Sequence, residues 1–305
     1  MSQRGTLELP VAMVTAATAA ASFALLTFEG CALVAGVEEG TLDSGQSSAT
    51  GGATGSGVPG GSGGTGATST ATGGSGTGVA GVGGGGGSGT TYAEEVLSDD
   101  PLAYWRLGED TTPVANDASG NGHDGTFVGG ITVSQPGAIA GDPDTAVHFD
   151  GGAEVTVGDV FGFDGTAPFS AEAWIKPETD AASFIGKAAR PSGSFIGWLV
   201  YFQDGLLTMR RGDILDCQGA APVSNQFTHV VATYDGLTMR VYANGVEVGT
   251  RQSSSSVPVH SEPFTFGRTY QWGAFQGVMD EVAVYGANLS PARILAHYEK
   301  GMGTR

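Results

Sequence analysis

Gly277-Val-Met-Asp-Glu-Val-Ala-Val-Tyr285 is the stretch around which the rest of the chain is arranged. Successive residues alternate between two predicted strand faces, one with Val278, Asp280, Val282 and Val284 and the other with Met279, Glu281, Ala283 and Tyr285. Because both faces are mostly apolar, the pattern indicates a strand covered on both sides, in the middle of a layered structure. Burying an unpaired carboxylate costs free energy, so both acids need partners.

Composition limits the classes of partner. The 305 residues include 13 Lys and Arg against 31 Asp and Glu, which gives a net charge of −18 and a pI near 4.4. Phosphate binding needs a basic footprint, so nucleic acid is not expected as a partner. The two cysteines, Cys31 and Cys217, lie far apart in regions of different character, and no disulfide framework is predicted.

The amino terminus has the pattern of an export signal. Arg4 precedes an uncharged apolar run over residues 9–28, which ends in Phe28-Glu29-Gly30-Cys31. This ending is similar to a bacterial lipoprotein cleavage box, in which Cys31 would become the lipidated first residue. We therefore interpret residues 1–35 as a signal peptide of lipoprotein type. Ordinary signal cleavage near Ala35 or an uncleaved anchor are the alternatives.

Residues 36–90 are predicted to form a disordered tether. Gly, Ser, Thr and Ala dominate the segment, and it cannot bury enough apolar surface to offset its ordering entropy. Such a tether would hold the domain at residues 91–305 clear of a bacterial surface, so the chain is expected in the cell envelope or at the cell surface, lipid-anchored, or alternatively secreted.

The domain itself reads as all-β. Short β-type runs follow one another with Gly, Pro or Asp between them: 101–107, 145–150, 153–157, 169–176, 195–202 and 206–210. Asp235-Gly236 and Asn244-Gly245 then punctuate a meander over residues 228–250, the second pair being typical of a type I′ hairpin. Ser290 and Pro291 predict the start of one short helix that ends at Gly301. The pattern predicts a two-sheet antiparallel jelly-roll sandwich with a short C-terminal helix.

An ordered set of motifs resembles a known family. They are Tyr104-Trp-Arg-Leu-Gly-Glu109, Asp117-x-Ser-Gly-Asn-Gly122, Phe149-Asp-Gly151, Phe169-Ser-Ala-Glu-Ala-Trp174, His229-Val-Val-x-Thr-Tyr-Asp-Gly236, Val241-Tyr-Ala-Asn-Gly245, Phe266-Gly-Arg268 and Met279-Asp-Glu-Val-x-Val-Tyr285. Together they resemble the laminin-G-like jelly-roll domain of the concanavalin A-like lectin and glucanase superfamily, over about residues 92–301. The resemblance implies a curved two-sheet sandwich, often calcium-bearing, on secreted or surface proteins that bind glycans or other proteins. Phe227 departs from the family, which usually has Trp there.

A calcium site is predicted from one loop and the opening strand. Asp117, Ser119 and Asn121 occupy positions 1, 3 and 5 of a calcium-loop pattern, but position 12 is Val128, where a bidentate Glu is required. Asp280 could supply the missing carboxylate if the first and last strands lie side by side. The alternative is that Asp117 and Asn121 form Asx turns and that Asp280 caps backbone amides. Glu281 has no predicted partner.

Aromatic residues on one loop are the candidates for ligand binding. Tyr270, Trp272 and Phe275 lie between two predicted strands, where they could stack on sugar rings or simply plug the loop. The closely spaced carboxylate pair of a glycosidase is absent, and the isolated Glu172 is expected to pair with Lys or backbone rather than to catalyse. We therefore expect a surface-tethered or secreted, non-catalytic binding module for a glycan or an extracellular protein, stabilised by calcium. A glycoside hydrolase-like enzyme on the same fold and a purely structural envelope protein are the alternatives.

Overall fold

The structure is a computed structural model that describes residues 90–212, 215–220, 225–269 and 273–304. The predicted signal peptide, Cys31 and residues 36–89 of the predicted tether lie outside these residues. Within them the helices are α1 (Tyr92–Leu97), the 3₁₀ turn η1 (Pro191–Gly193) and α2 (Pro291–Gly301). The strands are β1 (Ala103–Trp105), β2 (Val114–Ala115), β3 (Gly125–Val128), β4 (Ile131–Pro136), β5 (Thr145–Asp150), β6 (Glu154–Gly158), β7 (Phe169–Pro177), β8 (Ala181–Ala189), β9 (Ile196–Gln203), β10 (Leu206–Arg211), β11 (Leu215–Ala220), β12 (Thr228–Tyr234), β13 (Thr238–Ala243), β14 (Val246–Gln252), β15 (Phe264–Phe266) and β16 (Gln276–Tyr285). No helix in the described ranges has the length and apolar character needed to cross a bilayer.

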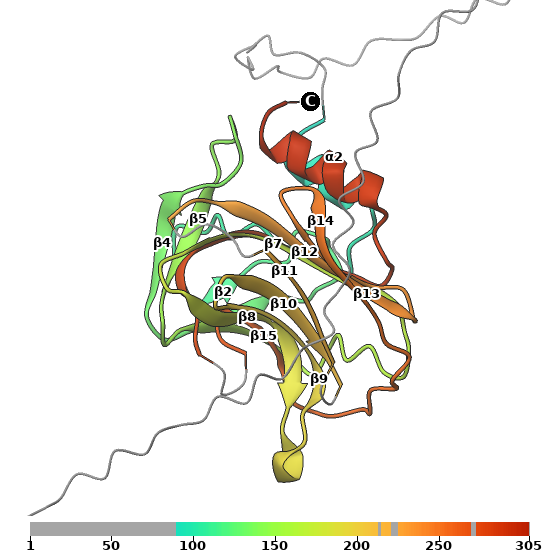
Figure 1. The fold of residues 1–305 in the computed structure, drawn as a ribbon. Helices are drawn as coiled ribbons and strands as arrows, with labels where there is room; N and C mark the ends of the chain where they lie inside the picture. Colours follow the sequence, from blue (N-terminus) through green and yellow to red (C-terminus); the bar gives the residue numbers. More distant parts are fainter. Residues whose placement is uncertain (1–89, 213–214, 221–224, 270–272, 305) are drawn as a thin grey trace, which may run out of the picture. The chain divides into compact units, whose positions relative to one another are not determined.

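The strands form two antiparallel sheets that pack face to face, as Figure 1 shows. Sheet A has the order β14-β13-β12-β7-β16-β5-β4, with β1 also paired to β16, and sheet B has the order β11-β10-β9-β8-β15-β6-β3-β2. An aromatic core fills the space between them and includes Trp105, Phe149, Phe169, Phe184, Trp198, Phe264 and Phe275. The predicted all-β two-sheet sandwich with a short C-terminal helix is confirmed.

Local sequence signals account for several turns and caps. Asn244 and Gly245 both have positive φ, 52° and 78°, as the predicted type I′ turn between β13 and β14 requires. The Ser290 side chain accepts a hydrogen bond from the amide of Arg293 at the start of α2. The short helix α1 is not anticipated by the sequence analysis, although Thr91 and Glu94 form a reciprocal capping box around its first turn.

The central strand β16 does not alternate as predicted. The register with β7 shifts between Asp280 and Ala283, and Glu281 has a φ of 52°. This bulge lies where the neighbour of β16 on its other edge changes from β5 to β1. Met279 consequently shares the inter-sheet core with Val282 and Val284, whereas the predicted faces separated them. Because the bulge adds a residue to β16, the predicted alternation holds on only one side of the bulge, and on the other side each residue points to the face opposite to the predicted one.

A helical cap made of α1 and α2 covers the outer face of sheet A. The cap and the sheet share one buried cluster, which includes Tyr92, Val96, Tyr104, Trp174, Val231, Tyr242, Ala283, Tyr285, Leu289 and Ile294. Figure 1 shows α2 lying against this sheet and away from β8, β9 and β10. The cap thus leaves the outer face of sheet B without a helix on it.

Glu172, on β7, is the polar centre of this cap and is buried. Its carboxylate accepts hydrogen bonds from the hydroxyls of Tyr92 and Tyr285, each at 2.9 Å. The His229 Nε2 atom lies 2.8 Å from Glu172 Oε1, and the His297 Nδ1 atom lies 3.0 Å from Oε2. Strands β7, β12 and β16 and both helices are therefore joined at one carboxylate.

His297 lies between two carboxylates and carries a positive charge. Its Nδ1 atom contacts Glu172, and its Nε2 atom lies 2.9 Å from Asp99 Oδ2. Because ionised carboxylates only accept hydrogen bonds, both ring nitrogens must carry a proton. Burial opposes this charge, but Glu172 and then Asp99 outweigh it and raise the pKa of His297. Burial likewise opposes ionisation of Glu172, yet His297 and His229 hold its pKa well below the usual value.

The charge on His297 predicts a pH-dependent stability. Folding raises the pKa of His297. Its contribution to the free energy of unfolding is therefore complete below its pKa in the unfolded chain, about 6.5, and is lost as the pH rises through its pKa in the folded chain. We expect the free energy of unfolding, measured by urea denaturation, to fall as the pH increases above about 6.5. The His297→Gln variant should lose about 3–5 kcal/mol at pH 6 and lack this fall.

Val96→Ala is the matched control for the His297 variant. It truncates a buried cap residue without removing a titratable group, so it should lower stability by about 1–3 kcal/mol equally across the pH range. A His297→Gln profile parallel to that of the unaltered chain would contradict the assignment of the charge.

Candidate ligand-binding site

The outer face of sheet B is built by strand register. Residues paired across strands point to the same face, and the pairs Thr126–Thr156, Thr156–Thr265 and Thr265–Gly186 run across β3, β6, β15 and β8. Their neighbours along the strands, Phe127, Val155 and Phe266, lie in the core between the sheets. The row of threonine residues therefore points outward, and Thr126 and Thr156 give this part of the face hydroxyl groups, whereas Thr265 is buried and donates to the carbonyl oxygen of Arg268.

Arg210 and Asp216 continue the same row on β10 and β11. Arg210 Nε and Nη2 donate to the two carboxylate oxygens of Asp216 at 2.6 and 2.5 Å. The guanidinium also lies over two aromatic rings, with its central carbon 5.8 Å from the centre of the Phe195 ring and 5.7 Å from that of Tyr201. We call these four residues the Arg210 group.

The Tyr201 hydroxyl completes the Arg210 group. It donates to Asp216 Oδ2 at 3.3 Å and accepts from Arg210 Nη2 at 3.4 Å. Burial, and then the charge of Asp216, raise the pKa of Tyr201 to about 12, so the hydroxyl stays protonated at neutral pH. A largely buried aromatic ring, a planar cation and a carboxylate are thereby held in a fixed arrangement on the outer side of sheet B.

A hollow of about 270 Å³ adjoins Tyr201. It is lined by Ala181, Ala182, Ser183, Tyr201, Phe202, Gln203 and Gly273. Ser183 fixes its rim, because the Ser183 hydroxyl donates to the carbonyl oxygens of Thr269 and Gly273 at 3.0 and 3.1 Å. Pockets for drug-sized ligands measure about 300–1,000 Å³, so this hollow suits a ligand part of one or two small rings.

The predicted aromatic loop meets this hollow at its described ends. Thr269 and Gly273 both bond to Ser183, and Ala274 forms a bridge with it. Tyr270 and Trp272 lie outside the described residues, so their role in ligand binding stays a prediction. The assignment of Phe275 to ligand binding is wrong: its side chain is fully buried and packs against other rings of the inter-sheet core. Apolar aromatic residues next to a strand are drawn into the core, and Phe275 immediately precedes β16.

The loop half of the predicted calcium site is occupied by backbone amides. Asp117 Oδ1 accepts from the amides of Tyr104 and Ser119 at 3.0 and 2.9 Å, and Oδ2 accepts from His123 at 2.9 Å. The Asn121 amide group donates to the carbonyl oxygens of Pro101 and Leu102. These contacts are the turn chemistry that the sequence analysis gave as the alternative.

Asp280 lies in different surroundings from Asp117. The bridge between Trp105 and Asp117 and the pairing of Trp105 with Val282 place β1 between the loop and β16. Asp280 Oδ2 accepts from the amide of Ala138 at 2.7 Å, whereas its Oδ1 is buried without a hydrogen-bond partner. Burial, and then the charge of Glu281, raise the pKa of Asp280 well above its usual value. No group of three or more His, Cys, Asp or Glu side chains in the described ranges is arranged to hold a metal ion.

Glu281, for which the sequence offered no partner, is held by β1 and the residue after it. It accepts hydrogen bonds from the Tyr104 hydroxyl and from Arg106, whose Nη2 lies 3.1 Å from Glu281 Oε1. Arg106 also pairs with Asp142 and Asp144, each at 2.9 Å. Burial raises the pKa of Glu281 to about 7, although Arg106 opposes the shift. The bulge makes this contact possible because it turns Glu281 toward β1.

Glu172 is excluded as an accessible catalytic carboxylate by its burial under the cap. The expectation that it pairs with Lys or backbone is also wrong, since two histidines and two tyrosines hold it. His297 lies 125 positions and Tyr285 113 positions away in the chain. No local sequence pattern could have indicated these partners.

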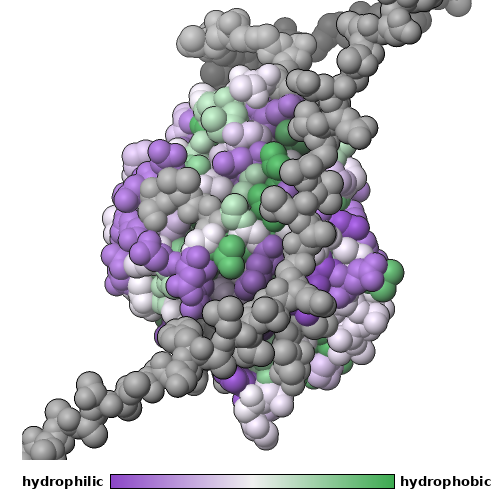
Figure 2. Space-filling model, in the orientation of Figure 1, coloured by the Kyte–Doolittle hydropathy of each residue, from purple (hydrophilic) through white to green (hydrophobic). Residues whose placement is uncertain are grey.

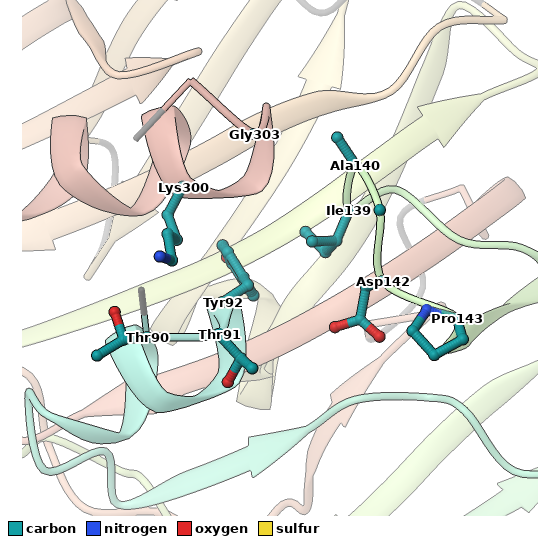
Figure 3. A pocket seen from close by; sticks show the side chains of 10 residues that line it. Thr90, Thr91, Tyr92, Ile139, Ala140, Asp142, Pro143, Lys300 and Gly303 are labelled. Atoms are coloured by element: carbon teal, nitrogen blue, oxygen red, sulfur yellow. The ribbon is translucent and has the colours of Figure 1, made fainter. Parts of the chain in front are cut away.

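A second hollow, of about 280 Å³, lies between the start of α1, the end of α2 and residues 139–143 (Figure 3). Lys300 extends into it from the helix and Asp142 from the opposite loop. Asp142 is already paired with Arg106. Tyr92 and Ile139 supply an apolar wall. This hollow has more polar lining residues than the one at Tyr201, but its described lining has no arginine held against aromatic rings, so we take the outer face of sheet B, with its Arg210 group, as the stronger candidate.

The part of the surface in view is uneven in polarity. Figure 2 shows hydrophilic residues gathered on the side of the molecule where β4 and β5 lie, while hydrophilic and apolar residues mix over the rest of the visible coloured surface. Such mixing is ordinary on a protein surface, so the choice of site rests on the contacts given above.

Comparisons with known proteins agree with the fold. Domain 4 of AbnA, a GH43 extracellular arabinanase from Geobacillus stearothermophilus solved in complex with arabinotriose, superposes with a TM-score of 0.51 and 22% identity over 65% of this chain and 98% of that one. The binding domain of botulinum neurotoxin DC, solved in complex with rat synaptotagmin II, superposes with a TM-score of 0.50 and 14% identity over 67% of this chain and 52% of that one. At these identities the likeness shows the fold. None of the curated proteins compared matches the chain.

The sequence motifs are matched independently of the structure. Residues 149–295 match the family described as the concanavalin A-like lectin/glucanases superfamily, and this range covers β6–β16, the end of β5 and the start of α2. The resemblance drawn from the motifs is confirmed, and residues 149–295 of this chain match the concanavalin A-like lectin and glucanase superfamily in sequence pattern as well as in fold.

Proposed function

We propose that the chain is an exported, surface-tethered, non-catalytic binding module that recognises a glycan through the outer face of sheet B. The observation that carries the proposal is the Arg210 group beside the hollow at Tyr201, on the sheet face that the helices do not cover. The Tyr201 ring is only 6% exposed, so contacts with a sugar would come chiefly from polar groups, and planar Arg and Asp groups match sugar hydroxyls.

Two structural neighbours bear on the kind of ligand. The arabinanase domain was solved with arabinotriose and the neurotoxin domain with a protein, synaptotagmin II. A glycan is favoured for this chain because the hollow is small, whereas a stable protein interface usually buries about 1,200–2,000 Å². Recognition of an extracellular protein is the alternative, and it would be favoured if no polysaccharide binds.

Binding is favoured over hydrolysis by the pairing of two carboxylates on this face, Asp216 with Arg210 and Glu154 with Arg268. Glycosidases place two carboxyl groups about 5–10 Å apart around the sugar bond, one of them free to give or take a proton. Both oxygens of Asp216 accept hydrogen bonds from Arg210. A carboxylate held in this way serves recognition better than proton transfer.

Tyr201→Ala tests the glycan proposal. The unaltered chain should be retarded in native gels that contain arabinan, galactan or β-glucan, and the variant should lose at least tenfold in affinity, about 1.4 kcal/mol, because it removes a wall of the hollow and its hydroxyl contacts. Tyr298→Ala, on helix α2 over the outer face of sheet A, is the matched control and should bind like the unaltered chain. Trp272→Ala tests the loop prediction separately.

The glycan proposal would be abandoned if no polymer retards the chain, or if Tyr201→Ala folds and binds unchanged. Circular dichroism melts of each variant separate lost binding from lost folding.

We also propose that calcium stabilises the domain, with Asp280 as the ligand that this chain offers. Asp280 Oδ1 is a buried carboxylate oxygen without a hydrogen-bond partner, the kind of donor that a hard cation takes up. Asp117 does not fit the same role, because both its oxygens accept amide hydrogen bonds. Asp144 and Glu281 lie close enough to Asp280 to raise its pKa, so cation binding there would also release protons.

Calcium should raise the melting temperature of the chain, and EDTA should lower it. Asp280→Asn is expected to abolish the difference between the two conditions. Asp117→Asn should lower the melting temperature in both conditions alike, because it weakens the loop without removing the cation ligand. Melting curves of the unaltered chain that coincide with calcium and with EDTA would eliminate the calcium proposal.

The anchor is proposed to be a lipid on Cys31. Acyl chains contribute roughly 0.8 kcal/mol per buried methylene, so a doubly or triply acylated cysteine would hold the tether stably at a membrane. In a bacterial host, the unaltered chain should incorporate radiolabelled palmitate and sediment with membranes, whereas Cys31→Ser should do neither. Equal labelling of both chains, or of neither, would point to the ordinary signal or uncleaved anchor instead.

A further inference from the structure

We infer that the glycan recognised on the outer face of sheet B is electrically neutral rather than a uronic acid, sulfated or phosphorylated polymer. This inference rests on the proposed function and names the class of ligand that the same site takes. It follows from how the charges on and around that face are arranged.

The positive charge of Arg210 is already neutralised by Asp216, a carboxylate of the same site. Binding of carboxylate, sulfate or phosphate groups uses the planar fork of an Arg side chain, and in this site the Nε and Nη2 donors of Arg210 hold both oxygens of Asp216. The Arg210 and Asp216 side chains are only 18% and 21% exposed, so water screens the pair weakly. An anionic sugar would have to displace Asp216 and leave that carboxylate partly buried without its counter-ion, which is costly.

Two other cations that border sheet B are paired in the same way. Lys187, on β8, is buried and contacts Asp159, and Arg268, next to β15, lies 2.9 Å from Glu154 on β6. Each of these pairs sums to zero charge. Arg211 on β10 and Arg190 after β8 donate instead to backbone carbonyl oxygens, so the matching to carboxylates holds for Arg210, Lys187 and Arg268.

The field of the whole chain acts in the same direction. With a net charge of −18, the protein repels polyanions at distances within the screening length, which is about 10 Å at 0.1 M salt. Neutral hydroxyls, by contrast, can exchange hydrogen bonds with the outward threonine row and with the amide of Gln203 without any charge being displaced. Hydroxyl-rich neutral sugars are thus the ligands that the face fits.

The test compares polymers that differ in charge alone. Arabinan is converted to a hydroxyethyl derivative and a carboxymethyl derivative of equal substitution, and the purified full chain is run in native gels containing each, with polygalacturonate as a natural polyanion. At 20 mM NaCl the hydroxyethyl derivative should bind within threefold of arabinan. The carboxymethyl derivative should bind at least tenfold more weakly and regain part of its affinity at 500 mM NaCl, where repulsion is screened.

Asp216→Asn adds a direct test of the internal counter-ion. It leaves the guanidinium of Arg210 without its carboxylate, so the difference between the hydroxyethyl and carboxymethyl polymers should shrink at least threefold. Gln135→Glu, on β4 at the edge of sheet A opposite to β14, alters the net charge by the same amount in the opposite sense away from the site and should leave the difference as it is. If Asp216→Asn fails to fold, the comparison of neutral and charged polymers with the unaltered chain still tests the inference.

The two possible failures are distinguishable. Retention by the carboxymethyl derivative or polygalacturonate at or above the strength of the neutral polymers would overturn the inference and leave the glycan-binding proposal intact. Retention by no polymer, neutral or anionic, would overturn the proposed function and the inference with it.

Discussion

The carboxylate of Glu172 is the interaction on which the arrangement of this domain depends. It lies on β7, at the middle of sheet A, and takes hydrogen bonds from the first helix, from the last strand, from β12 and from α2. A buried carboxylate is tolerated only when its charge and its oxygens are matched, and here one imidazolium supplies the charge while hydroxyls and a second ring supply the remaining donors. Removing any one donor leaves the others facing an under-satisfied anion. The two ends of the domain are consequently held to its centre by a polar contact rather than by apolar packing alone.

This contact also determines which face of the sandwich is available. The outer face of sheet A carries Trp174, Tyr242 and Tyr285, and it would be a large exposed apolar surface without α1 and α2. Covering it uses the residues at both ends of the domain, so among the described residues neither α-helix lies on the outer side of sheet B. Leu199, Thr208 and Tyr201 on that side are nevertheless buried by their neighbours. Ligand binding is thus directed to sheet B by the way sheet A is closed.

The sequence predicted what local chemistry controls. The turn at Asn244-Gly245 and the start of α2 at Ser290-Pro291 follow from backbone preferences of a few residues, and the sandwich follows from the repeated short strands and the ordered motifs. The face assignment of β16 failed because alternation assumes an unbroken strand, and the bulge at Asp280-Glu281 arises only where β5 and β1 meet along its edge. That change of neighbour is a property of the assembled sheet. Single-strand periodicity contains no information about it.

The candidate site was predicted least well, and the reason is also non-local. The Arg210 group joins residues of β9, β10 and β11 with Phe195 just before them, and each taken alone is an ordinary strand residue. Phe275 has the composition of a binding residue but lies where the core needs a ring, whereas Tyr201 has the composition of a core residue but lies on the outward side of β9. Strand register decides that Phe275 is buried between the sheets and that Tyr201 lies on the outward side of β9. The direction that a side chain faces, rather than its chemical type, separates the binding residues of this fold from those that stabilise it.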